Sequence, residues 1–211
     1  MSVNYDVIIA GCGVAGLYAA LNLPQSLNIL ILCKKDLSLC NSMLAQGGIA
    51  GVYNSETDNI QYHQNDTLIA GSFKNNVDAV QTLVSEAAQD IERIINMGVE
   101  FDKNPDGTFH RTLEGGHSHH RVFHKADSTG KEITTTLLEN VRKLPNVTIL
   151  ENTIMCETRR TYTGYSALLK DKNDTYSTAN CHFMILATGG IGRVYQFTTN
   201  SAIATGDGIT F

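Results

Sequence analysis

The chain has 211 residues, of which 42% are hydrophobic and 18% are charged. A chain of this size and composition can bury a sizeable core without disulfides or metals, which excludes disordered and collagen-like proteins. Sixteen basic residues against 21 acidic residues give a net charge of −5, which argues against a nucleic-acid or membrane-surface binder. The apolar stretches are far shorter than the roughly 20 residues that a membrane-spanning helix needs. The five cysteines have no C-x-x-C spacing, so we expect reduced, unpaired thiols in a cytosolic protein.

The first 33 residues predict a strand, a glycine-rich turn, a helix and a second strand. The run Val7–Ala10 is apolar throughout and leads directly into Gly11, and a pattern of small apolar residues then continues to Pro24. Ile29–Leu32 is a second continuous apolar run. Short runs that are apolar on both faces are typical of buried parallel strands.

The middle of the chain predicts one long loop and one strong helix. Residues 34–58 have no periodicity, and we expect a long ligand-facing loop there, which can include one helical turn. Residues 76–97 repeat apolar side chains at i, i+3 and i+4, which predicts an amphipathic helix with Gly98 just past its end. Residues 99–111 predict a short β excursion around an Asn-Pro-Asp-Gly turn.

Further elements follow toward the end of the chain. A capping-box pattern at Thr129–Glu132 starts a second helix, which is expected to stop before Pro145. Residues 147–150 predict a strand, residues 153–178 a β-meander, and residues 183–186 a last buried strand. We therefore expect an α/β, doubly wound (Rossmann-like) sheet with a β-meander insertion.

A nucleotide-binding fingerprint lies between the first strand and the first helix. Gly11–Gly16 reads Gly-Cys-Gly-Val-Ala-Gly and matches G-x-G-x-x-G in the required context. The three glycines would form the turn, admit a pyrophosphate to the backbone, and let the helix pack on the strand. The N-terminus of the helix would then attract the pyrophosphate. The alternative is a tight strand-to-helix turn that binds no ligand.

The fingerprint departs from the usual pattern at its acidic residue. The place where an acidic residue normally binds the ribose holds Lys34 and Lys35. This leaves two interpretations, NADP or a flavin fold that holds its adenosine differently. Two later glycine-rich turns, at 187–190 and at 206–208, favour one extended ligand such as FAD, although each alone could be an ordinary turn.

Five blocks of sequence together resemble a known flavoprotein family. They are residues 11–16, 41–50, 114–121, 126–130 and 187–190. In this order they are similar to the family of L-aspartate oxidase, fumarate reductase and succinate dehydrogenase. The resemblance covers essentially the whole chain.

Three positions favour the aspartate oxidase branch of this family. Members with covalent FAD attach it through a histidine where this chain has Asn41, so the resemblance implies non-covalent FAD. Lys34 at the end of the second strand is also typical of aspartate oxidases, which removes the argument for NADP. Glu114 is a third such residue, because a carboxylate can pair with the α-ammonium that aspartate has and succinate lacks. The alternative for Glu114 is a solvated loop acid.

The resemblance also assigns site residues. It names Glu114 as the catalytic candidate. Its FAD contacts correspond to Gly11, Cys12, Gly13, Val14, Ala15, Gly16, Lys34, Asn41, Ser42, Met43, Leu44, Ala45, Gln46, Gly47, Gly48, Thr188, Gly189 and Asp207.

Five of the seven histidines lie between residues 110 and 124. A metal site is disfavoured, because no cysteine or second carboxylate with ligand spacing lies nearby. A loop whose imidazoles donate hydrogen bonds to a dicarboxylate fits the resemblance better.

The activity implied by the resemblance is the FAD-dependent oxidation of L-aspartate to iminoaspartate, with oxygen or fumarate as acceptor. The product would pass to quinolinate synthase in the de novo route to NAD, in the cytoplasm. We expect residues 1–211 to be the N-terminal portion of the FAD-binding domain, without the capping domain and the C-terminal helical region, and with little activity alone. The alternatives are a soluble flavoprotein of the fumarate reductase or succinate dehydrogenase type, and a non-catalytic FAD-binding module.

Overall fold

The computed structural model describes residues 3–211, and the chain divides into two compact units. The first unit combines the chain up to residue 44 with residues 134–211, and the second comprises residues 45–133. Helix α5 (Thr129–Arg142) runs across this boundary. Within the described residues, the helices are too short or too polar to cross a membrane.

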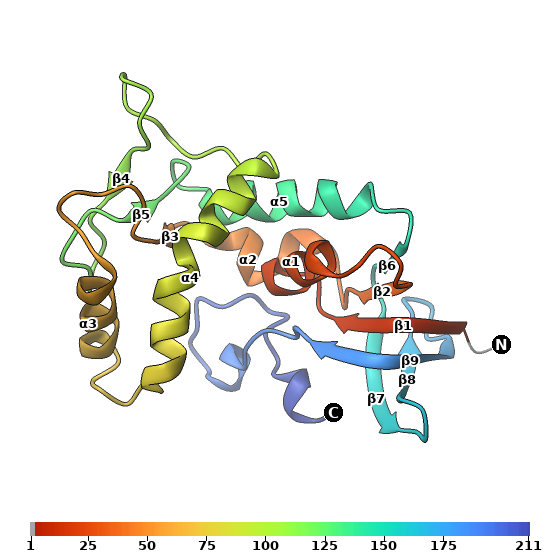
Figure 1. The fold of residues 1–211 in the computed structure, drawn as a ribbon. Coiled ribbons are helices and arrows are strands. Elements are labelled where there is room, and N and C mark those ends of the chain that lie inside the picture. Colours follow the sequence, from red (N-terminus) through yellow and green to blue (C-terminus); the bar gives the residue numbers. More distant parts are fainter. Residues whose placement is uncertain (1–2) are drawn as a thin grey trace. The chain divides into compact units, whose positions relative to one another are not determined.

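The first unit is built on one six-stranded sheet (Figure 1). Its order is β6-β2-β1-β9-β8-β7; β6, β2, β1 and β9 are parallel, whereas β9, β8 and β7 are antiparallel. The strands are β1 (Val3–Ala10), β2 (Ile29–Leu32), β6 (Val147–Leu150), β7 (Ile154–Arg160), β8 (Tyr165–Lys170) and β9 (Tyr176–Leu186). The predicted parallel strands and the predicted meander are both confirmed, and they belong to the same sheet.

Strand β1 lies at the centre of this sheet, between β2 and β9 (Figure 1). The chain continues from β1 to β2 on one side and returns in β9 on the other. The side chains of Ile8 and Leu30 belong to one hydrophobic core with Met155 of β7 and with Ala167 and Leu169 of β8. Such a reversal of strand order opens a crevice at the carboxyl ends of the strands, where ligands of open α/β sheets bind.

Short helices complete the first unit. Helix α1 (Val14–Asn22) ends shortly before Pro24, as predicted, and η1 (Leu37–Leu39) and α2 (Asn41–Leu44) interrupt the predicted loop. The 3₁₀ turns η2 (Gly192–Val194) and η3 (Asp207–Ile209) lie near the end of the chain. The region after β2 is therefore more helical than its lack of periodicity suggests.

The second unit packs two helices and a small sheet. Helix α4 (Val77–Asn96) matches the predicted helix, and Gly98 follows it with a φ of 105°. The sheet is β3 (Ile49–Ala50), β5 (Val122–Phe123) and β4 (Arg111–Thr112), in the order β3-β5-β4. Phe101, Phe109 and Phe123 form an aromatic core beside it, with ring centroids 5.5 to 6.4 Å apart.

One helix was not predicted, and two local predictions need correction. Helix α3 (Ile60–Ala70) was not predicted, because it has no apolar stripe. His63 is its only buried side chain. The strand at 183–186 is not fully buried, since 66% of Phe183 is exposed on a face that the described chain does not cover. The capping box at Thr129 does not form, because the Thr129 hydroxyl accepts from the Lys125 N–H and the Glu132 carboxylate accepts from the Glu100 N–H.

The prediction that all five cysteines are unpaired is wrong. Cys12 and Cys33 form a disulfide, with their Cα atoms 5.4 Å apart, and the free thiols are Cys40, Cys156 and Cys181. The two bonded residues follow the carboxyl ends of β1 and β2, which are adjacent parallel strands. Parallel pairing thus brings together cysteines that are 21 positions apart, which a search for short cysteine spacings does not detect.

We expect a thiol count to report this pairing. The chain, purified without reductant and unfolded, should react with a thiol reagent at three cysteines, and at five after reduction. A Cys33→Ser variant is the matched control and should give four reactive thiols in both conditions. Five reactive thiols in the untreated protein would contradict the disulfide.

Candidate functional site

Two glycine-rich turns meet at the carboxyl edge of the first unit's sheet. The Gly11 N–H donates to the Leu32 carbonyl (2.9 Å), and the Ala187 N–H donates to the Ala10 carbonyl (2.8 Å). The turn after β1 and the turn after β9 are therefore held side by side by backbone hydrogen bonds. This is the edge at which the fingerprint predicts a pyrophosphate.

Close backbone approach explains two of the fingerprint glycines. A Cβ on Gly11 would overlap the carbonyl of Ala187, and Gly11 also has a φ of +120°. A Cβ on Gly16 would overlap the carbonyl of Gly11. The first and third glycines of the motif therefore serve the packing of β1, α1 and β9 against one another.

A cavity of about 410 Å³ opens at this edge. It is mainly apolar, and its size is in the range of small-molecule sites. It is lined by predicted site residues from five segments: Gly11, Cys12, Gly13, Ala15, Lys34, Asn41, Ser42, Thr188, Gly189 and Asp207. The structure thus brings together around one cavity most of the predicted cofactor residues of the first unit.

The other predicted cofactor residues lie elsewhere. Val14, Gly16, Met43 and Leu44 belong to the first unit but do not line the cavity. Residues 45–48 belong to the second unit, where Gly48 packs tightly against the backbone of Phe123 and leaves no room for a Cβ.

Lys34 fastens the late turn to the end of β2. Its ammonium donates to the Ile203 carbonyl (2.8 Å), the Thr205 hydroxyl (2.6 Å) and the Asp207 carboxylate (2.7 Å). An ammonium has three protons, so all three are committed within the chain. Burial disfavours the charged form of Asp207, but the hydrogen bonds from Lys34 and Thr205 outweigh it and lower the pKa of the carboxyl.

This arrangement argues against a 2′-phosphate beside Lys34. Asp207 compensates the positive charge, and the ammonium has no further proton to donate. Lys34 is therefore engaged within the chain and does not supply the free cation that an NADP 2′-phosphate would need.

Asn41 and Ser42 join the cavity from α2. The Asn41 amide donates to Asn200 Oδ1 (2.9 Å) and its oxygen accepts from the Ser201 N–H (2.8 Å). The Ser42 hydroxyl accepts from the Val14 N–H (3.2 Å), at the first turn of α1. An amide nitrogen is not nucleophilic, so Asn41 cannot form the covalent bond to a cofactor that a histidine can form.

In the second unit, Glu114 lies on an exposed turn. Its carboxylate accepts a long hydrogen bond from Thr112 Oγ1 (3.4 Å), and its backbone carbonyl accepts from the His117 N–H (3.1 Å). The carboxylate therefore faces solvent, and the turn places His117 beside it.

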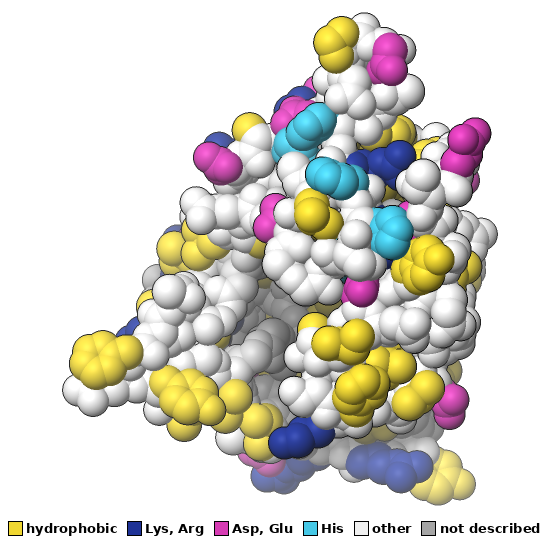
Figure 2. Space-filling view, turned by 90° about the vertical axis from the view of Figure 1, so that its left-hand side faces the viewer, with side chains coloured by type: hydrophobic (Ala, Val, Ile, Leu, Met, Phe, Trp, Pro, Cys, Tyr) yellow, Lys and Arg dark blue, Asp and Glu magenta, His cyan; other side chains and the backbone are white. Residues whose placement is uncertain are grey.

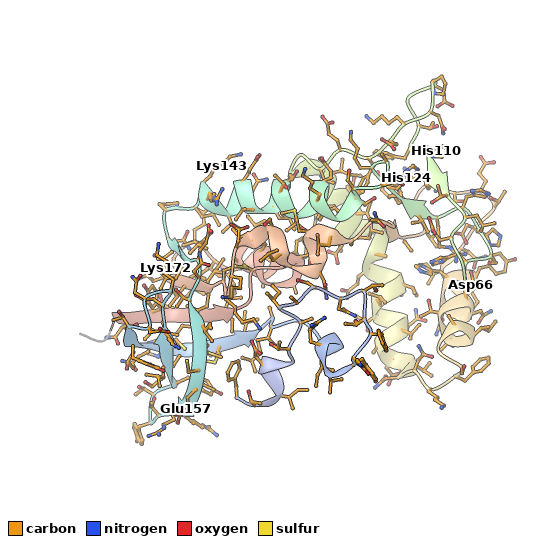
Figure 3. The ribbon with its side chains drawn as sticks, turned by 180° about the vertical axis from the view of Figure 1, so that it is seen from behind. Asp66, His110, His124, Lys143, Glu157 and Lys172 are labelled. Carbon is orange, nitrogen blue, oxygen red and sulfur yellow. A yellow bond between two sulfur atoms is a disulfide. The ribbon has the colours of Figure 1, made fainter. Side chains whose placement is uncertain are left out.

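A buried guanidinium holds the segment that follows. Arg121 is completely buried, and it donates from Nε and Nη2 to both oxygens of Asp58 (2.8 and 2.7 Å). Nη1 donates to Asp66 on α3 (2.5 Å; Figure 3). A buried ion pair of this kind is costly to break, by about 3–5 kcal/mol, because the remaining charge has no partner.

Charge and burial shift the pKa values around Arg121. Burial opposes the ionisation of Asp66, but hydrogen bonds from Arg121 and Ser118 lower its pKa to about 2. Burial and the charge of Arg121 both lower the pKa values of His63 and His117. Although burial opposes it, hydrogen bonds from Arg121 lower the pKa of Asp58 as well, so Asp58 and Asp66 are both ionised at pH 7. The imidazoles of His63 and His117 are neutral at that pH.

The histidine-rich segment contains separate groups rather than one cluster. His110 Nδ1 lies 2.7 Å from His124 Nε2, and His124 Nδ1 lies 3.3 Å from Asp102 (Figure 3). His117 and His119 instead lie at Arg121. Figure 2 shows imidazole side chains spaced out along one face, among acidic side chains. Groups of three possible metal ligands are absent from the described residues.

Sequence reasoning missed the residues that anchor this segment. Asp58, His63 and Asp66 lie on or next to α3, which has no apolar periodicity to mark it as a helix. A local signal does exist, since Asp58, His63 and Asp66 follow one another at intervals of five and three positions, against about 3.6 residues in one helical turn.

Lys34→Met tests the link to the late turn. The change removes three hydrogen bonds and leaves Asp207 uncompensated, so we expect the free energy of unfolding to fall by about 1–3 kcal/mol. Urea denaturation measures the loss, and Lys35→Met, which changes the exposed neighbouring lysine, should cost less than about 0.5 kcal/mol. Equal losses in the two variants would contradict the role of Lys34.

Asp66→Asn tests the buried ion pair through pH. With a folded pKa of about 2 against 3.8 unfolded, Asp66 contributes about 2 kcal/mol at neutral pH, and this contribution is lost as the pH falls through 4 toward 2. The variant should be less stable at pH 7 and should lose about 1 kcal/mol less than the unmodified chain between pH 7 and pH 3. Parallel stability curves from urea denaturation would contradict this assignment.

Comparison with known proteins agrees with this geometry. A family model described as an FAD binding domain matches residues 6–211. L-aspartate oxidase from Clostridium acetobutylicum is 41% identical over 213 residues, covering 99% of this chain and 48% of that protein. The L-aspartate oxidase of Clostridium perfringens is 41% identical over 204 residues, covering 97% and 46%. The chain thus spans less than half the length of these curated relatives.

Solved structures agree with the fold. An E. coli quinol fumarate reductase matches with a TM-score of 0.91 at 26% identity, over 99% of this chain and 36% of that one. A quinol–fumarate reductase with menaquinol molecules matches with a TM-score of 0.92 at 26% identity, over 99% and 37%. The strand order, the cavity at the carboxyl edge and the family match lead to one conclusion: this chain belongs to the family of FAD-binding domains, and its cofactor is FAD.

Proposed function

We propose that the chain is the FAD-binding part of an enzyme that oxidises L-aspartate to iminoaspartate. The observation that carries the proposal is the convergence of the turns at 11–13, 187–190 and 206–208 on one cavity. The identity of 41% to L-aspartate oxidases supports the aspartate branch over the fumarate reductases, which match at 26%.

The residues around the cavity would hold FAD without a covalent bond. The backbone at Cys12–Ala15 would receive the pyrophosphate at the N-terminus of α1, as the glycine contacts and the cavity lining favour. Lys34 and Asp207 would shape the adenosine end, and Thr188 and Gly189 the opposite wall. Residues 41–48 would lie along the ribityl chain and the flavin, with Asn41 in place of an attaching histidine.

Glu114 would bind the ammonium of the substrate. Its carboxylate is exposed and weakly held, so it can exchange a long hydrogen bond for an ion pair. The reaction removes a hydride from Cα and a proton from the amino group, and forms a C=N bond. When bound, FAD supplies the two-electron acceptor.

The remaining parts of the proposal rest on the resemblance. Oxygen or fumarate would reoxidise the enzyme, and the product would pass to quinolinate synthase for NAD synthesis. The cytoplasm is the proposed location. The argument for it from unpaired thiols no longer applies, since Cys12 and Cys33 form a disulfide.

Assays of the full-length protein that contains this chain test the proposal. Acid precipitation should release FAD into the supernatant, as non-covalent binding requires. L-aspartate, with oxygen, should yield hydrogen peroxide, whereas succinate should not be oxidised. Oxidation of succinate but not of aspartate would instead support the fumarate reductase alternative, and FAD binding with neither activity would support a non-catalytic module.

Glu114→Gln tests the ammonium contact. Loss of a charged partner should lower kcat/KM for L-aspartate by about ten- to a hundredfold, while FAD affinity is unchanged. Glu100→Gln is a control at another exposed carboxylate of the same unit and should retain full activity. Unchanged kinetics with Glu114→Gln would remove this residue from the site.

A further inference from the structure

We propose that Arg121 is a positioning residue that fixes His117 as a neutral hydrogen-bond donor for a carboxylate of the bound substrate. The proposal rests on the proposed function for the identity of that carboxylate. The state of the imidazole itself follows from contacts within the second unit.

The first step is an accounting of the guanidinium protons. Arg121 has five N–H groups and cannot accept a hydrogen bond. Three N–H groups face Asp58 and Asp66. The remaining two face imidazole nitrogens, with Nη1 3.2 Å from His117 Nδ1 and Nη2 3.5 Å from His119 Nδ1. Four of the five protons of the buried cation therefore have an acceptor, whereas the role of His119 Nδ1 depends on the tautomer of that ring.

The second step gives the tautomer of His117. Because Arg121 only donates, His117 Nδ1 must accept, and a neutral ring then carries its proton on Nε2. Protonation of Nδ1 would set two cationic donors against each other at 3.2 Å. Nδ1 of His119 also lies 2.8 Å from the Ser118 hydroxyl, so the contacts of that ring do not fix its tautomer.

The third step concerns the charges that face His117. Burial and Arg121 lower its pKa, while Asp66, Asp58 and Glu114 oppose the shift without cancelling it. The ring of His63 packs on it, with centroids 5.6 Å apart, and is itself neutral at pH 7 because burial lowers its pKa as well. His117 thus stays neutral at pH 7 although three carboxylates surround it.

The fourth step fixes the position of the ring. Ser118 donates from its N–H and its hydroxyl to Asp66, each at 2.8 Å, which ties the loop to α3. The His117 N–H donates to the Glu114 carbonyl, so both residues belong to one turn. That turn offers a carboxylate, which accepts from an ammonium, and an Nε2–H, which donates to a carboxylate. An α-amino acid carries both of those groups, whereas succinate and fumarate carry only the second.

NMR of the ¹⁵N-labelled chain tests the imidazole directly, without cofactor or activity. Long-range ¹H–¹⁵N correlation should show His117 as the neutral Nε2–H tautomer at pH 7, with a pKa below 6.5, and the missing signal in His117→Gln assigns it. Arg121→Lys replaces the rigid guanidinium by a single ammonium, so His117 Nδ1 loses its fixed donor. The His117 imidazole should then become a mixture of tautomers.

A second variant covers the case in which Arg121→Lys fails to fold. Asp66→Asn removes a carboxylate that opposes the pKa shift of His117, so the pKa of His117 should fall further. Asp102→Asn is the matched control, because Asp102 faces His124, and it should leave the signals of His117 unchanged. A His117 that is protonated at pH 7, or that carries its proton on Nδ1, would overturn the inference.

Kinetics of the full-length protein test the link to substrate. His117→Gln retains a donor near the Nε2 position and should keep kcat/KM for L-aspartate within about threefold, whereas His117→Leu should lose about ten- to a hundredfold. Equal losses in the two variants would reduce His117 to a packing role and overturn the proposal. If NMR gives the expected tautomer but L-aspartate is not oxidised, the proposed function fails and the imidazole assignment stands.

Discussion

The close approach of the Ala187 backbone to Gly11 is the contact on which the cavity of the first unit depends. The carbonyl of Ala187 occupies the space that a side chain at Gly11 would fill, so the turns after β1 and β9 can lie side by side. Because β1 has β2 on its other side, the same edge also receives the loop that carries Lys34. The cavity exists because three turns share one edge, and no single turn would form it.

Both candidate sites compensate their strong charges within the chain. Lys34 is matched by Asp207, and Arg121 is matched by Asp58 and Asp66. The first pair is partly exposed and fixes a loop at modest energetic cost, whereas Arg121 is fully buried and its removal would leave two unpaired carboxylates. In each case the cation holds a segment in place, and other groups remain available for a ligand.

The sequence allowed prediction of elements whose signal is local. The β1–α1–β2 unit follows from apolar runs and the glycine motif, and α4 follows from its i, i+3, i+4 pattern. Contacts between distant residues could not be predicted. The disulfide of Cys12 and Cys33 depends on strand pairing, and the partners of Arg121 lie 55 and 63 positions away, one on a helix without an apolar face and the other just before it.

The exposed face of β9 is a second feature that could not be predicted from local sequence. Apolar residues at 183–186 predict burial, yet a strand is buried only if another element covers it, and composition does not say which element does. The family resemblance supplied part of the missing information about distant contacts. Five sequence blocks occur in the same order as in that family, so they predict which distant segments bind one cofactor. The resemblance could not supply the state of an individual imidazole, which depends on the donors within about 3 Å of it.

The contrast among the acidic residues of the second unit gives the final argument. Asp58 and Asp66 are ionised and fully engaged by Arg121, so neither can bind a further cation without breaking a buried pair. Glu114 accepts one long hydrogen bond at the surface and can bind an ammonium at little cost. The buried carboxylates hold the guanidinium, the guanidinium holds His117, and the turn at His117 presents Glu114. Substrate recognition at this turn would therefore depend on residues that never touch the substrate.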